Sequence, residues 1–448
     1  MTSVIEEWAA AGTADPATAD PSWPRLLRPT ATGRAPTDLE DHLRLWGWPA
    51  GLDDPRGRAI AELIDAVAAA GLGGRGGAGF PTADKMRSVA GAAGRRKPVV
   101  VVNAAESEPA SAKDRALLAG APHLVLDGAQ LAAAAVGAWH ITVAVHRGDP
   151  AADGLAAAIR DRAARWPAAA TVEIAQVPRR YVASQETALV RWLSGGEARP
   201  AVAPPRPSER GVRRHPTLVQ NAETMAHIAL ISRFGPAWFR SVGTPDEPGT
   251  RLLTVSGAVA APGVYEVAGG MRGADVLAAA GGCPVGVRAV LVGGYGGRWL
   301  PAEEFRSAPL TTRRAPGSVA LGAGVVIALP TSGCGVRETA RIAGWLAGQS
   351  AGQCGPCAFG LPAISDQLSA LAAGSLDRNG VATLERWAGQ VRGRGACAHP
   401  DGVAQLVTSA LTVFADEIDQ HVDGRCSARP DTPPVCPLPI GTEEEPWR

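Results

Sequence analysis

Three cysteines in the C-terminal part of the sequence have the spacing of metal ligands. Cys354 and Cys357 stand at C-x-x-C spacing in AGQCGPCAFG, just before an expected helix, and Cys397 follows in a later loop, GRGACAHPDG. Thiolates from one tight turn and one distant loop commonly hold iron–sulfur clusters or zinc. A C-x-x-C pair can also form a redox dithiol. The pattern favours a metal or cluster, and leaves a redox pair and inert cysteines open.

The other four cysteines have no such spacing. Cys283 and Cys334 stand singly beside glycine, and Cys426 and Cys436 lie near the C-terminus, so we expect structural roles for all four. The total of 7 cysteines is odd, and the first residues do not have the basic-then-apolar pattern expected of an export signal. Both features argue against a disulfide framework. We expect the 8 scattered histidines to be loop or surface residues.

A glycine-rich segment that ends on lysine, GLGGRGGAGFPTADK at residues 71–85, has the composition of an anion-binding loop. Closely spaced main-chain N–H groups form concavities for negative charge, and glycine permits the close approach. The segment contains G-x-G-x-x-G, but a dinucleotide-binding loop must follow a strand. Here the preceding residues have the apolar spacing of a helix, at Ile60, Leu63, Ile64 and Val67. We therefore expect neither a Rossmann phosphate loop nor a P-loop, and weigh an anion cradle against a flexible linker.

Composition excludes several classes of function. The net charge is +1 and 19% of residues are charged, so nothing favours nucleic acid or an anionic membrane surface as a partner. Of 448 residues, 46% are hydrophobic, which is enough for several packed domains. The most apolar stretch, residues 124–145, is broken by Asp127, Gln130 and His140. We expect a cytoplasmic protein that does not insert into a membrane directly.

The alternation of helices and strands over residues 56–240 predicts an α/β domain with a parallel or mixed sheet. Residues 1–55 are expected to form an N-terminal arm with a short helix near 38–46. The expected strands are 98–103, 141–145 and 171–177, and the expected helices are 115–137, 150–164 and 221–233. A proline-punctuated loop, residues 199–216, crosses to the last of these helices.

Two further segments of the chain have different residue patterns. Residues 245–332 have short β-branched runs with one helix at 273–280, which predicts a small α+β domain. Residues 336–422 carry apolar stripes at helical spacing, and residues 423–448 form a tail. The whole chain is therefore predicted to combine an α/β, an α+β and an all-α part.

Several long motifs together resemble one family, the NADH-oxidising, FMN-binding flavoprotein subunit of respiratory complex I and the related diaphorase subunits of NAD-linked hydrogenases and formate dehydrogenases. The motifs are GRGGAGFPT (74–82), ESEP (106–109), KDR (113–115), YVASQETAL (181–189), PTLVQNAET (216–224), SGAVAAPGVYEV (256–267) and the cysteine segment. The resemblance implies a Rossmann-like FMN-binding domain, a ubiquitin-like β-grasp (SLBB) domain and a helical bundle with one [4Fe–4S] cluster.

The resemblance also implies site residues. Those expected to hold FMN are Gly74, Arg75, Gly76, Gly77, Lys85, Asn103, Glu106, Glu108, Glu186, Asn221 and Thr224. Glu106 and Glu186 are expected to orient nicotinamide and flavin, and Phe80 to stack on the NADH adenine. Cys354, Cys357 and Cys397 are the expected cluster ligands.

The sequence departs from the family pattern around the nicotinamide. The family motif Asn-Ala-Asp-Glu corresponds here to Asn103-Ala104-Ala105-Glu106, so its aspartate is replaced by Ala105. In the family motif Gly-Glu-Glu-Thr, the first two residues are replaced by Ser184 and Gln185. In the family motif Asn-Asn, the first asparagine is replaced by Gln220. Two positions where the family carries adenine-stacking aromatics are Met86 and the loop containing Arg213 and Arg214. The loss of two aromatic contacts weakens such a site by about tenfold or more. NADPH, or no nicotinamide, therefore stays open beside NADH.

The cluster motif departs as well. The family pattern Ser-Cys-Gly-x-Cys-x-x-Cys has Ala351 at its first cysteine, so three thiolates remain for a [3Fe–4S] cluster or a [4Fe–4S] cluster with another fourth ligand. The resemblance implies electron flow from NADH through FMN and the cluster to other subunits or to a ferredoxin-like or thioredoxin-fold carrier. Such partners would place the chain at the inner face of a membrane. The alternative is a non-catalytic electron relay or assembly subunit with weakened NADH binding.

Overall fold

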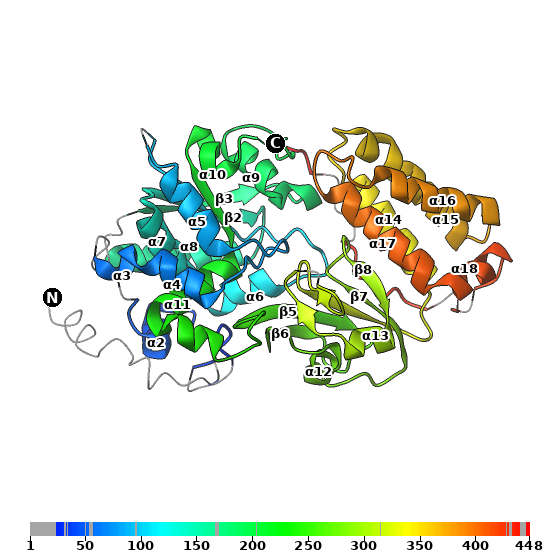
Figure 1. Cartoon of the computed structure of the whole chain (residues 1–448), viewed down its shortest axis with the longest axis horizontal. Helices are drawn as coiled ribbons and strands as arrows, with labels where there is room; N and C mark the ends of the chain where they lie inside the picture. Colours follow the sequence, from blue (N-terminus) through cyan, green and yellow to red (C-terminus); the bar gives the residue numbers. More distant parts are fainter. Residues whose placement is uncertain are drawn as a thin grey trace.

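The computed structural model describes residues 24–448 except 31, 32, 34, 50, 53–56, 95, 166–169, 203, 314, 427, 430, 431 and 440–444. Three parts lie side by side (Figure 1): an α/β part, a mixed β-sheet with short helices, and a helical bundle at the opposite end from the α/β part. This arrangement confirms the mixed α/β fold with a parallel sheet and a helical C-terminal part.

A four-stranded parallel sheet forms the centre of the α/β part. Its order is β3-β2-β1-β4, and the strands are β1 (Val99–Asn103), β2 (His140–His146), β3 (Thr171–Val177) and β4 (Thr217–Asn221). Side chains alternate between the two faces of a strand. Accordingly Val100 and Val102 enter one core and Val101 enters the other. β4 was not predicted; it directly follows the segment expected to be a loop, residues 199–216, and pairs with β1.

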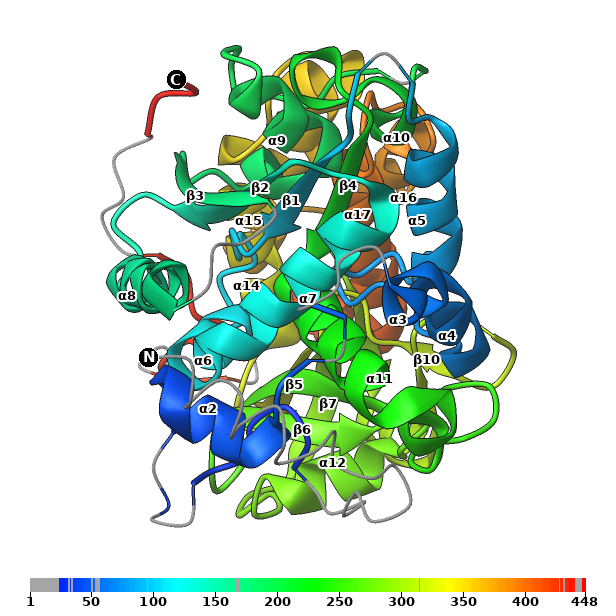
Figure 2. The ribbon, with the colours of Figure 1, turned by 90° about the vertical axis from the view of Figure 1, so that its left-hand side faces the viewer.

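Helices cover both faces of this sheet, as Figure 2 shows. The larger core contains α4 (Leu63–Ala70), α5 (Thr82–Gly91), α7 (Pro122–Val136), α8 (Ala151–Arg165) and α11 (Ala222–Arg240). The opposite face packs against η1 (Tyr181–Ser184) and α9 (Glu186–Leu193). The single helix expected over 115–137 is two helices, because the chain turns at Ala121 between α6 (Lys113–Gly120) and α7. Shorter helices are α3 (Arg58–Ala61), α10 (Pro207–Arg210) and η2 (Val212–Arg214).

The N-terminal arm docks on the α/β part. Its helix α2 (Leu39–Trp46) lies where the sequence predicts one and is capped by Asp38, whose side chain accepts from the Asp41 N–H. His42 Nε2 lies 2.7 Å from Asp127 Oδ2, and both residues are buried. Asp127 also pairs with Arg162 at 2.6 Å and with Arg233. These cations, with His42, hold the pKa of Asp127 well below its usual value although burial alone would raise it.

The second sheet has five strands in the order β6-β5-β11-β7-β8. They are β5 (Thr250–Gly257), β6 (Gly263–Ala268), β7 (Val287–Val292), β8 (Arg298–Pro301) and β11 (Val325–Pro330). β11 runs parallel to β5 and antiparallel to β7. One face packs against α12 (Gly273–Ala279) and α13 (Ala302–Ser307), and β9 (Leu310–Thr311) pairs with β10 (Val319–Ala320) beside it.

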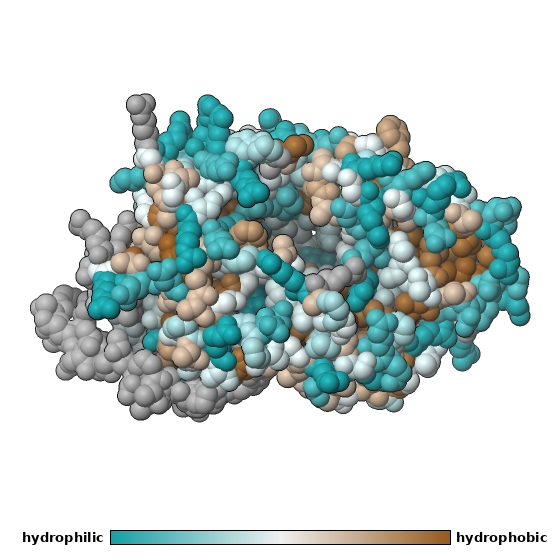
Figure 3. Space-filling view, viewed as in Figure 1, coloured by the Kyte–Doolittle hydropathy of each residue, from teal (hydrophilic) through white to brown (hydrophobic). Residues whose placement is uncertain are grey.

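The other face of this sheet packs against the helical bundle. Leu291, Trp299 and Ile327 enter one core with the bundle helices. These are α14 (Gly335–Gly348), η3 (Pro356–Gly360), α15 (Leu361–Ala372), α16 (Arg378–Val391), α17 (His399–Val413) and α18 (Ala415–Val422). A hydrophobic patch lies over these helices on the face shown in Figure 3.

Among the described residues, none of the helices is both long and apolar enough to cross a bilayer. The expectation that the histidines are surface or loop residues is wrong. Six of them are buried: His42, His123, His146, His227, His399 and His421. Four of them, His42, His146, His399 and His421, have a ring nitrogen within hydrogen-bond distance of a carbonyl or carboxylate oxygen, a contact that sequence spacing does not reveal.

Candidate functional site

The candidate site lies at the carboxyl ends of β1 and β4. From β1 the chain moves outward through β2 and β3 and then returns to place β4 on the other side of β1. In open parallel sheets, ligands bind in the crevice beyond the strand ends at such a reversal. Asn103 and Asn221 end the two strands and are register partners. Two of the predicted site residues therefore meet at the point where the topology favours a ligand.

The glycine loop lies over this edge. It joins α4 to α5 instead of following a strand, as predicted, and Gly74 N–H donates to Phe80 O at 2.9 Å. Arg75 N–H donates to Thr224 Oγ1 at 2.9 Å, which fixes the loop to the start of α11. A Cβ on Gly76 would lie 3.5 Å from Asn221 Cβ, and Gly77 has φ +107°.

The next amides of this loop face no partner in the protein. Within the described part of the chain, the N–H groups of residues 76–79 make no hydrogen bond of good geometry to a protein acceptor, although residues 75–78 form a turn. Consecutive free amides of this kind form an anion-binding concavity. The loop therefore fits the cradle interpretation better than a linker.

The Arg75 side chain points away from this cradle. Its guanidinium is buried and donates to Thr250 O at 3.0 Å, in the first strand of the second sheet. Glu223 lies 3.9 Å from its Nε. Burial lowers the pKa of Arg75, and the two carboxylates of Glu223 and Glu247 oppose that shift. Both the backbone N–H and the guanidinium of Arg75 are therefore engaged within the protein, and they fix the loop to α11 and to the second sheet.

Lys85 and Glu186 meet at the same edge. Lys85 Nζ lies 2.6 Å from Glu186 Oε1 and donates to Val219 O of β4 at 2.8 Å. Glu186 is the first residue of α9, and the side chain of Gln185 caps that helix by accepting from the Thr187 and Ala188 N–H groups. Gln185, which differs from the family glutamate at this position, therefore caps α9, and the Glu186 carboxylate is not used for capping and pairs with Lys85.

Asn103 carries an unsatisfied acceptor. Its Nδ2 donates to Ser184 O at 2.8 Å, whereas its buried Oδ1 has no hydrogen-bond partner in the described part of the chain. An unpaired buried acceptor costs about 1–3 kcal/mol, so such atoms usually mark strain or a ligand. Its position beside the free loop amides favours a ligand.

Beneath the crevice lies a buried charge cluster. Lys113 Nζ contacts Asp114 Oδ1 at 2.7 Å, Glu223 Oε2 at 3.0 Å and Asn221 Oδ1 at 3.2 Å. Asn221 Nδ2 donates to Asp114 Oδ2 at 2.6 Å. Burial raises the pKa of Asp114 to about 6, although Lys113 opposes the shift. Lys113 was not predicted as a site residue; its place in the KDR motif of a chain poor in lysine was the available signal.

Glu106 and Glu108 occupy different environments. Glu106 accepts from Ser111 Oγ and from the Asp114 N–H at 3.2 Å. Glu108 is buried and accepts from Tyr295 N–H at 2.9 Å and from Tyr181 Oη at 3.3 Å. Burial raises the pKa of Glu108 to about 7. Both carboxylates line a cavity of about 330 Å³.

Tyr181 connects this region to the cysteine segment. Its N–H donates to Gln349 Oε1 at 3.1 Å, and its ring meets Trp345 edge-on at a centroid distance of 5.4 Å. Gln349 directly follows α14, and the next residue, Ser350, donates to Cys357 O at 3.5 Å. One short series of contacts thus runs from the carboxylate loop to the predicted cluster site.

The three predicted cluster cysteines come together. Cys354 and Cys397 both lie close enough to Cys357 to affect the pKa of its thiol, and Cys354 likewise affects the pKa of Cys397. Burial, with the adjacent Cys354, raises the pKa of Cys357 to about 12. Their sulfur atoms are not all within 4.8 Å of one another, unlike the ligand atoms of the group formed by Cys334, His421 and Cys426. A wider thiol triad suits a cluster whose irons each take one cysteine better than a single zinc ion.

The positions where the family carries adenine-stacking aromatic residues differ in their exposure. Phe80 is 50% exposed and leaves a ring face open to a ligand. Met86 is fully buried in the α/β core, so its side chain does not face the crevice. Arg213 and Arg214 are at the surface in left-handed backbone conformations.

Comparisons with known proteins agree with this geometry. Residues 67–230 match the Nuo51 FMN-binding domain, and residues 337–421 match the iron–sulfur binding region of NADH-ubiquinone oxidoreductase F. The F2 subunit of the NADH-quinone oxidoreductase of Rhizobium meliloti is 32% identical over 81% of this chain and 89% of its own length. The HndC subunit of the NADP-reducing hydrogenase of Solidesulfovibrio fructosivorans is 28% identical over 87% of this chain and 82% of its own length.

A solved structure shows the same fold. The crystal structure of an NAD⁺-reducing [NiFe]-hydrogenase in the H₂-reduced state superposes with a TM-score of 0.74 at 32% identity, covering 85% of this chain. The chain spans about two thirds (66%) of that hydrogenase chain. Together these matches define a flavin- and iron–sulfur-binding protein of electron transfer, as the resemblance predicted. The chain belongs to the family of F subunits of NADH-quinone oxidoreductases.

Proposed function

We propose that this chain oxidises a reduced nicotinamide, NADH in the first place, and passes the electrons through FMN to an iron–sulfur cluster and on to a partner. One observation carries the proposal. The loop of residues 76–79, whose amides make no hydrogen bond of good geometry to the protein, and the unpaired Oδ1 of Asn103 lie at the ends of β1 and β4, and Tyr181 links the nearby Glu108 to the segment of three clustered thiols.

The residues of the crevice fit FMN. Free amides suit its phosphate, and Asn103 Oδ1 suits a ribityl hydroxyl or a ring N–H. Lys85, fixed by Val219 O and Glu186, adds positive charge at the same edge. Lys113, beneath Asn221, supports the floor of the crevice through Asp114 and Glu223. When bound, FMN supplies the change from two-electron to one-electron transfer.

The carboxylates orient the reactants. Glu186 lies at the N-terminus of α9, and its pairing with Lys85 holds its carboxylate at the edge of the crevice. Glu106 is held by Ser111 and by the amide of Asp114, so its position is set by the start of α6. Half-exposed Phe80 offers a stacking face for adenine. The proposed catalytic pair is therefore Glu106 and Glu186.

Cys354, Cys357 and Cys397 would hold the cluster, with Ala351 at the position of the family's first cysteine. Their chemistry fits, because thiolates are the usual ligands of iron–sulfur clusters. The hydroxyl of the neighbouring Ser350 already donates to Cys357 O. We therefore assign the fourth ligand to water or another side chain, with Ser350 as the alternative.

The finer assignments rest on the family. The mixed sheet with α12 is proposed to be a ubiquitin-like β-grasp domain of the SLBB type. Related subunits belong to multi-subunit enzymes, so we propose that other subunits or a ferredoxin-like carrier take the electrons. Through them the chain would lie on the cytoplasmic side of a membrane, with a quinone or another compound as the terminal acceptor.

A second function is favoured by specific departures. Met86 is buried and Arg213 and Arg214 replace an aromatic loop, so the adenine contacts are fewer than in the family. Either NADPH, met by the two arginines, or electron relay between other carriers would then replace NADH oxidation. The similarity to a subunit of an NADP-reducing hydrogenase supports NADPH as the alternative donor.

The deciding experiment mixes anaerobic, FMN-loaded protein with NADH or NADPH and follows the flavin absorbance. Bleaching by NADH within the mixing time supports the proposal, and faster bleaching by NADPH supports the NADP alternative. Intact flavin absorbance with both nucleotides, together with reduction by dithionite, supports the relay. Failure of the protein to retain any FMN after desalting would overturn the flavin site itself.

A further inference from the structure

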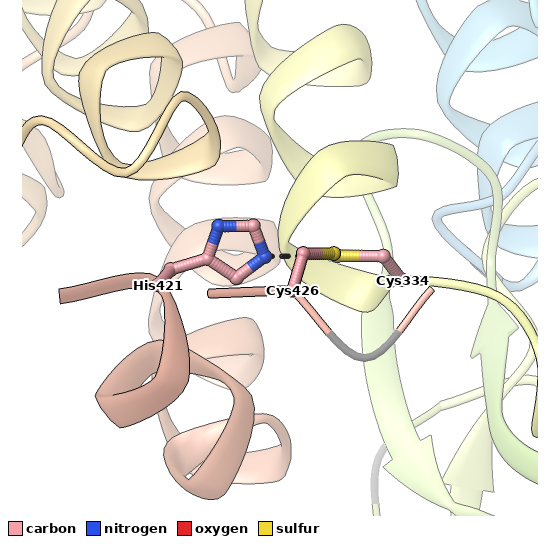
Figure 4. Close-up of side chains that lie close together, drawn as sticks. All are labelled: Cys334, His421 and Cys426. Carbon is pink, nitrogen blue, oxygen red and sulfur yellow. Dashed lines mark hydrogen bonds between the residues drawn. The ribbon is translucent and has the colours of Figure 1, made fainter. Parts of the chain in front are cut away.

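A second group of metal-ligating side chains lies in the helical bundle, apart from the three predicted cluster cysteines. The ligand atoms of Cys334, His421 and Cys426 all lie within 4.8 Å of one another. Figure 4 shows them converging from the start of α14, the end of α18 and the segment after α18. Cys334 Sγ lies 3.2 Å from His421 Nε2. Nothing in the proposed electron-transfer function uses these three residues.

The surroundings of His421 fix its tautomer. Its Nδ1 lies 3.1 Å from Leu371 O at the end of α15. A carbonyl can only accept, so Nδ1 carries the proton and Nε2 presents its lone pair to the two cysteines. Metal-binding histidines usually donate their other N–H to a carbonyl or carboxylate in this way. The ring is therefore oriented for coordination before any ion binds.

The surroundings of Cys334 shield its sulfur atom from solvent and give that atom one hydrogen-bond donor. Cys334 is the N-cap of the 14-residue helix α14, and its Sγ accepts from the Arg337 N–H at 3.3 Å. The N-terminus of a helix stabilises negative charge. Burial nevertheless raises the pKa of the Cys334 thiol to about 12, so a binding cation must displace its proton, as metals do at cysteine sites. Cys334 and His421 are 5% and 2% exposed, so an ion here would be shielded from bulk water.

We infer that Cys334, His421 and Cys426 bind a zinc ion that holds the C-terminal segment to the bundle. Two thiolates and one imidazole are a common partial ligand set for tetrahedral Zn²⁺. With the usual bond lengths, ligand atoms around zinc stand about 3.5–3.8 Å apart, which is within the span of this group. Water or one further side chain would complete the tetrahedron.

The position gives such an ion a structural role. Cys334 and His421 are 87 positions apart, so a shared ion would close a long loop across α14–α18. Closing a long loop removes entropy from the unfolded chain and stabilises the fold. Past Cys426 the chain returns to Glu338 through the N–H groups of Val435 and Cys436, and then lines the cavity beside Glu108 with Pro437. The ion would thus fix where this segment begins its path to the cavity.

Metal content tests the inference without reference to activity. The full-length protein is expressed in zinc-supplemented medium, purified anaerobically and desalted. Its zinc and iron contents are then measured by inductively coupled plasma mass spectrometry. We expect about one zinc per chain, which remains after brief treatment with a weak chelator. X-ray absorption at the zinc edge should show both sulfur and imidazole neighbours.

The variants C334S, C426S and H421N should each lose zinc to the chelator at least tenfold faster than the unchanged protein. Serine is a good N-cap, so C334S keeps the start of α14 while removing the sulfur. C283S is the matched control, because Cys283 lies in the second sheet domain and should not affect zinc. C354S and C397S should reduce iron and leave zinc unchanged.

Three results would overturn the inference. One is protein without zinc, even after reconstitution, in which Cys334 and Cys426 react with a thiol reagent as free thiols. A second is a protein mass 2 Da below that of the fully reduced chain, with the peptides that contain Cys334 and Cys426 cross-linked after digestion, which would indicate a disulfide. The third is zinc that is lost from C354S and C397S but retained by C334S and H421N, which would place the ion at the other cysteines. Circular dichroism of each variant separates loss of metal from loss of fold.

Discussion

The ammonium group of Lys85 lies 2.6 Å from Glu186 Oε1 and joins α5 to α9 at the carboxyl end of β4. Because Lys85 also donates to Val219 O, its position is fixed from two sides. The pair brings one predicted cofactor-binding residue into contact with one predicted catalytic residue. Their separation along the sequence gave no indication of this contact.

Replacement of Lys85 by methionine should weaken FMN binding about tenfold or more. A charged donor contributes about 1.5–3 kcal/mol to a hydrogen bond, and partial exposure of this lysine favours the lower end of the range. Flavin fluorescence titration of the apoprotein measures the change. K97M is the control, because Lys97 is another of the few lysines but is exposed and outside the crevice. Equal FMN affinity in K85M and K97M would contradict the assignment.

Much of the fold could be predicted from local patterns. The β-branched runs at β1, β2 and β3, and the apolar stripes of the bundle helices, correspond to elements near their expected positions. β4 was missed because its five residues, TLVQN, include three polar ones and follow a proline-rich loop. Pairing with β1 supplies its stability, and that pairing joins residues far apart in the chain.

The site was predictable in its residue types but not in its contacts. The glycine loop, Asn103 and Asn221 were predicted from motifs and meet at one sheet edge. The inward turn of Arg75, toward Thr250, depends on a domain 175 positions away. The grouping of Cys334 with His421 depends similarly on how the bundle packs, so spacing alone suggested isolated cysteines and surface histidines.

Phe80 provides a test of nicotinamide binding. The substitution F80A should raise KM for NADH about two- to tenfold with little change in kcat, because a stacking contact of about 0.5–1.5 kcal/mol is lost on binding. W139A is a suitable control, since Trp139 is also a half-exposed aromatic but lies at the opposite, amino end of the sheet. A fall in kcat with unchanged KM would show that Phe80 does not act through binding.

The missing fourth cysteine can be restored. The substitution A351C should slow the loss of the cluster's visible absorbance in air and bring the iron content closer to four per cluster. The physical reason is that a fourth thiolate protects an iron that otherwise has a weaker, exchangeable ligand. S350A serves as the comparison, because Ser350 is the neighbouring hydroxyl. If S350A loses the cluster and A351C changes nothing, Ser350 is the fourth ligand.

Glu108 gives the protein a pH-dependent stability with a defined sign. Its pKa is raised from 4.5 to about 7 because burial penalises the carboxylate. The folded state therefore keeps a proton that the unfolded state releases, so stability falls as pH rises from about 4.5 to about 7. A shift of this size corresponds to about 3 kcal/mol at most.

The substitution E108Q should remove that dependence, because glutamine keeps the shape and can still accept from Tyr295 N–H and Tyr181 Oη. Relative to the unchanged protein, E108Q should be similar in apparent melting temperature at pH 5 and higher by several degrees at pH 8. Asp114 titrates in both proteins, so its effect cancels in the comparison. E304Q, at an exposed glutamate, controls for loss of one acidic group. An equal difference between E108Q and the unchanged protein at pH 5 and pH 8 would show that Glu108 is ionised throughout, held by the Tyr295 amide in spite of its burial.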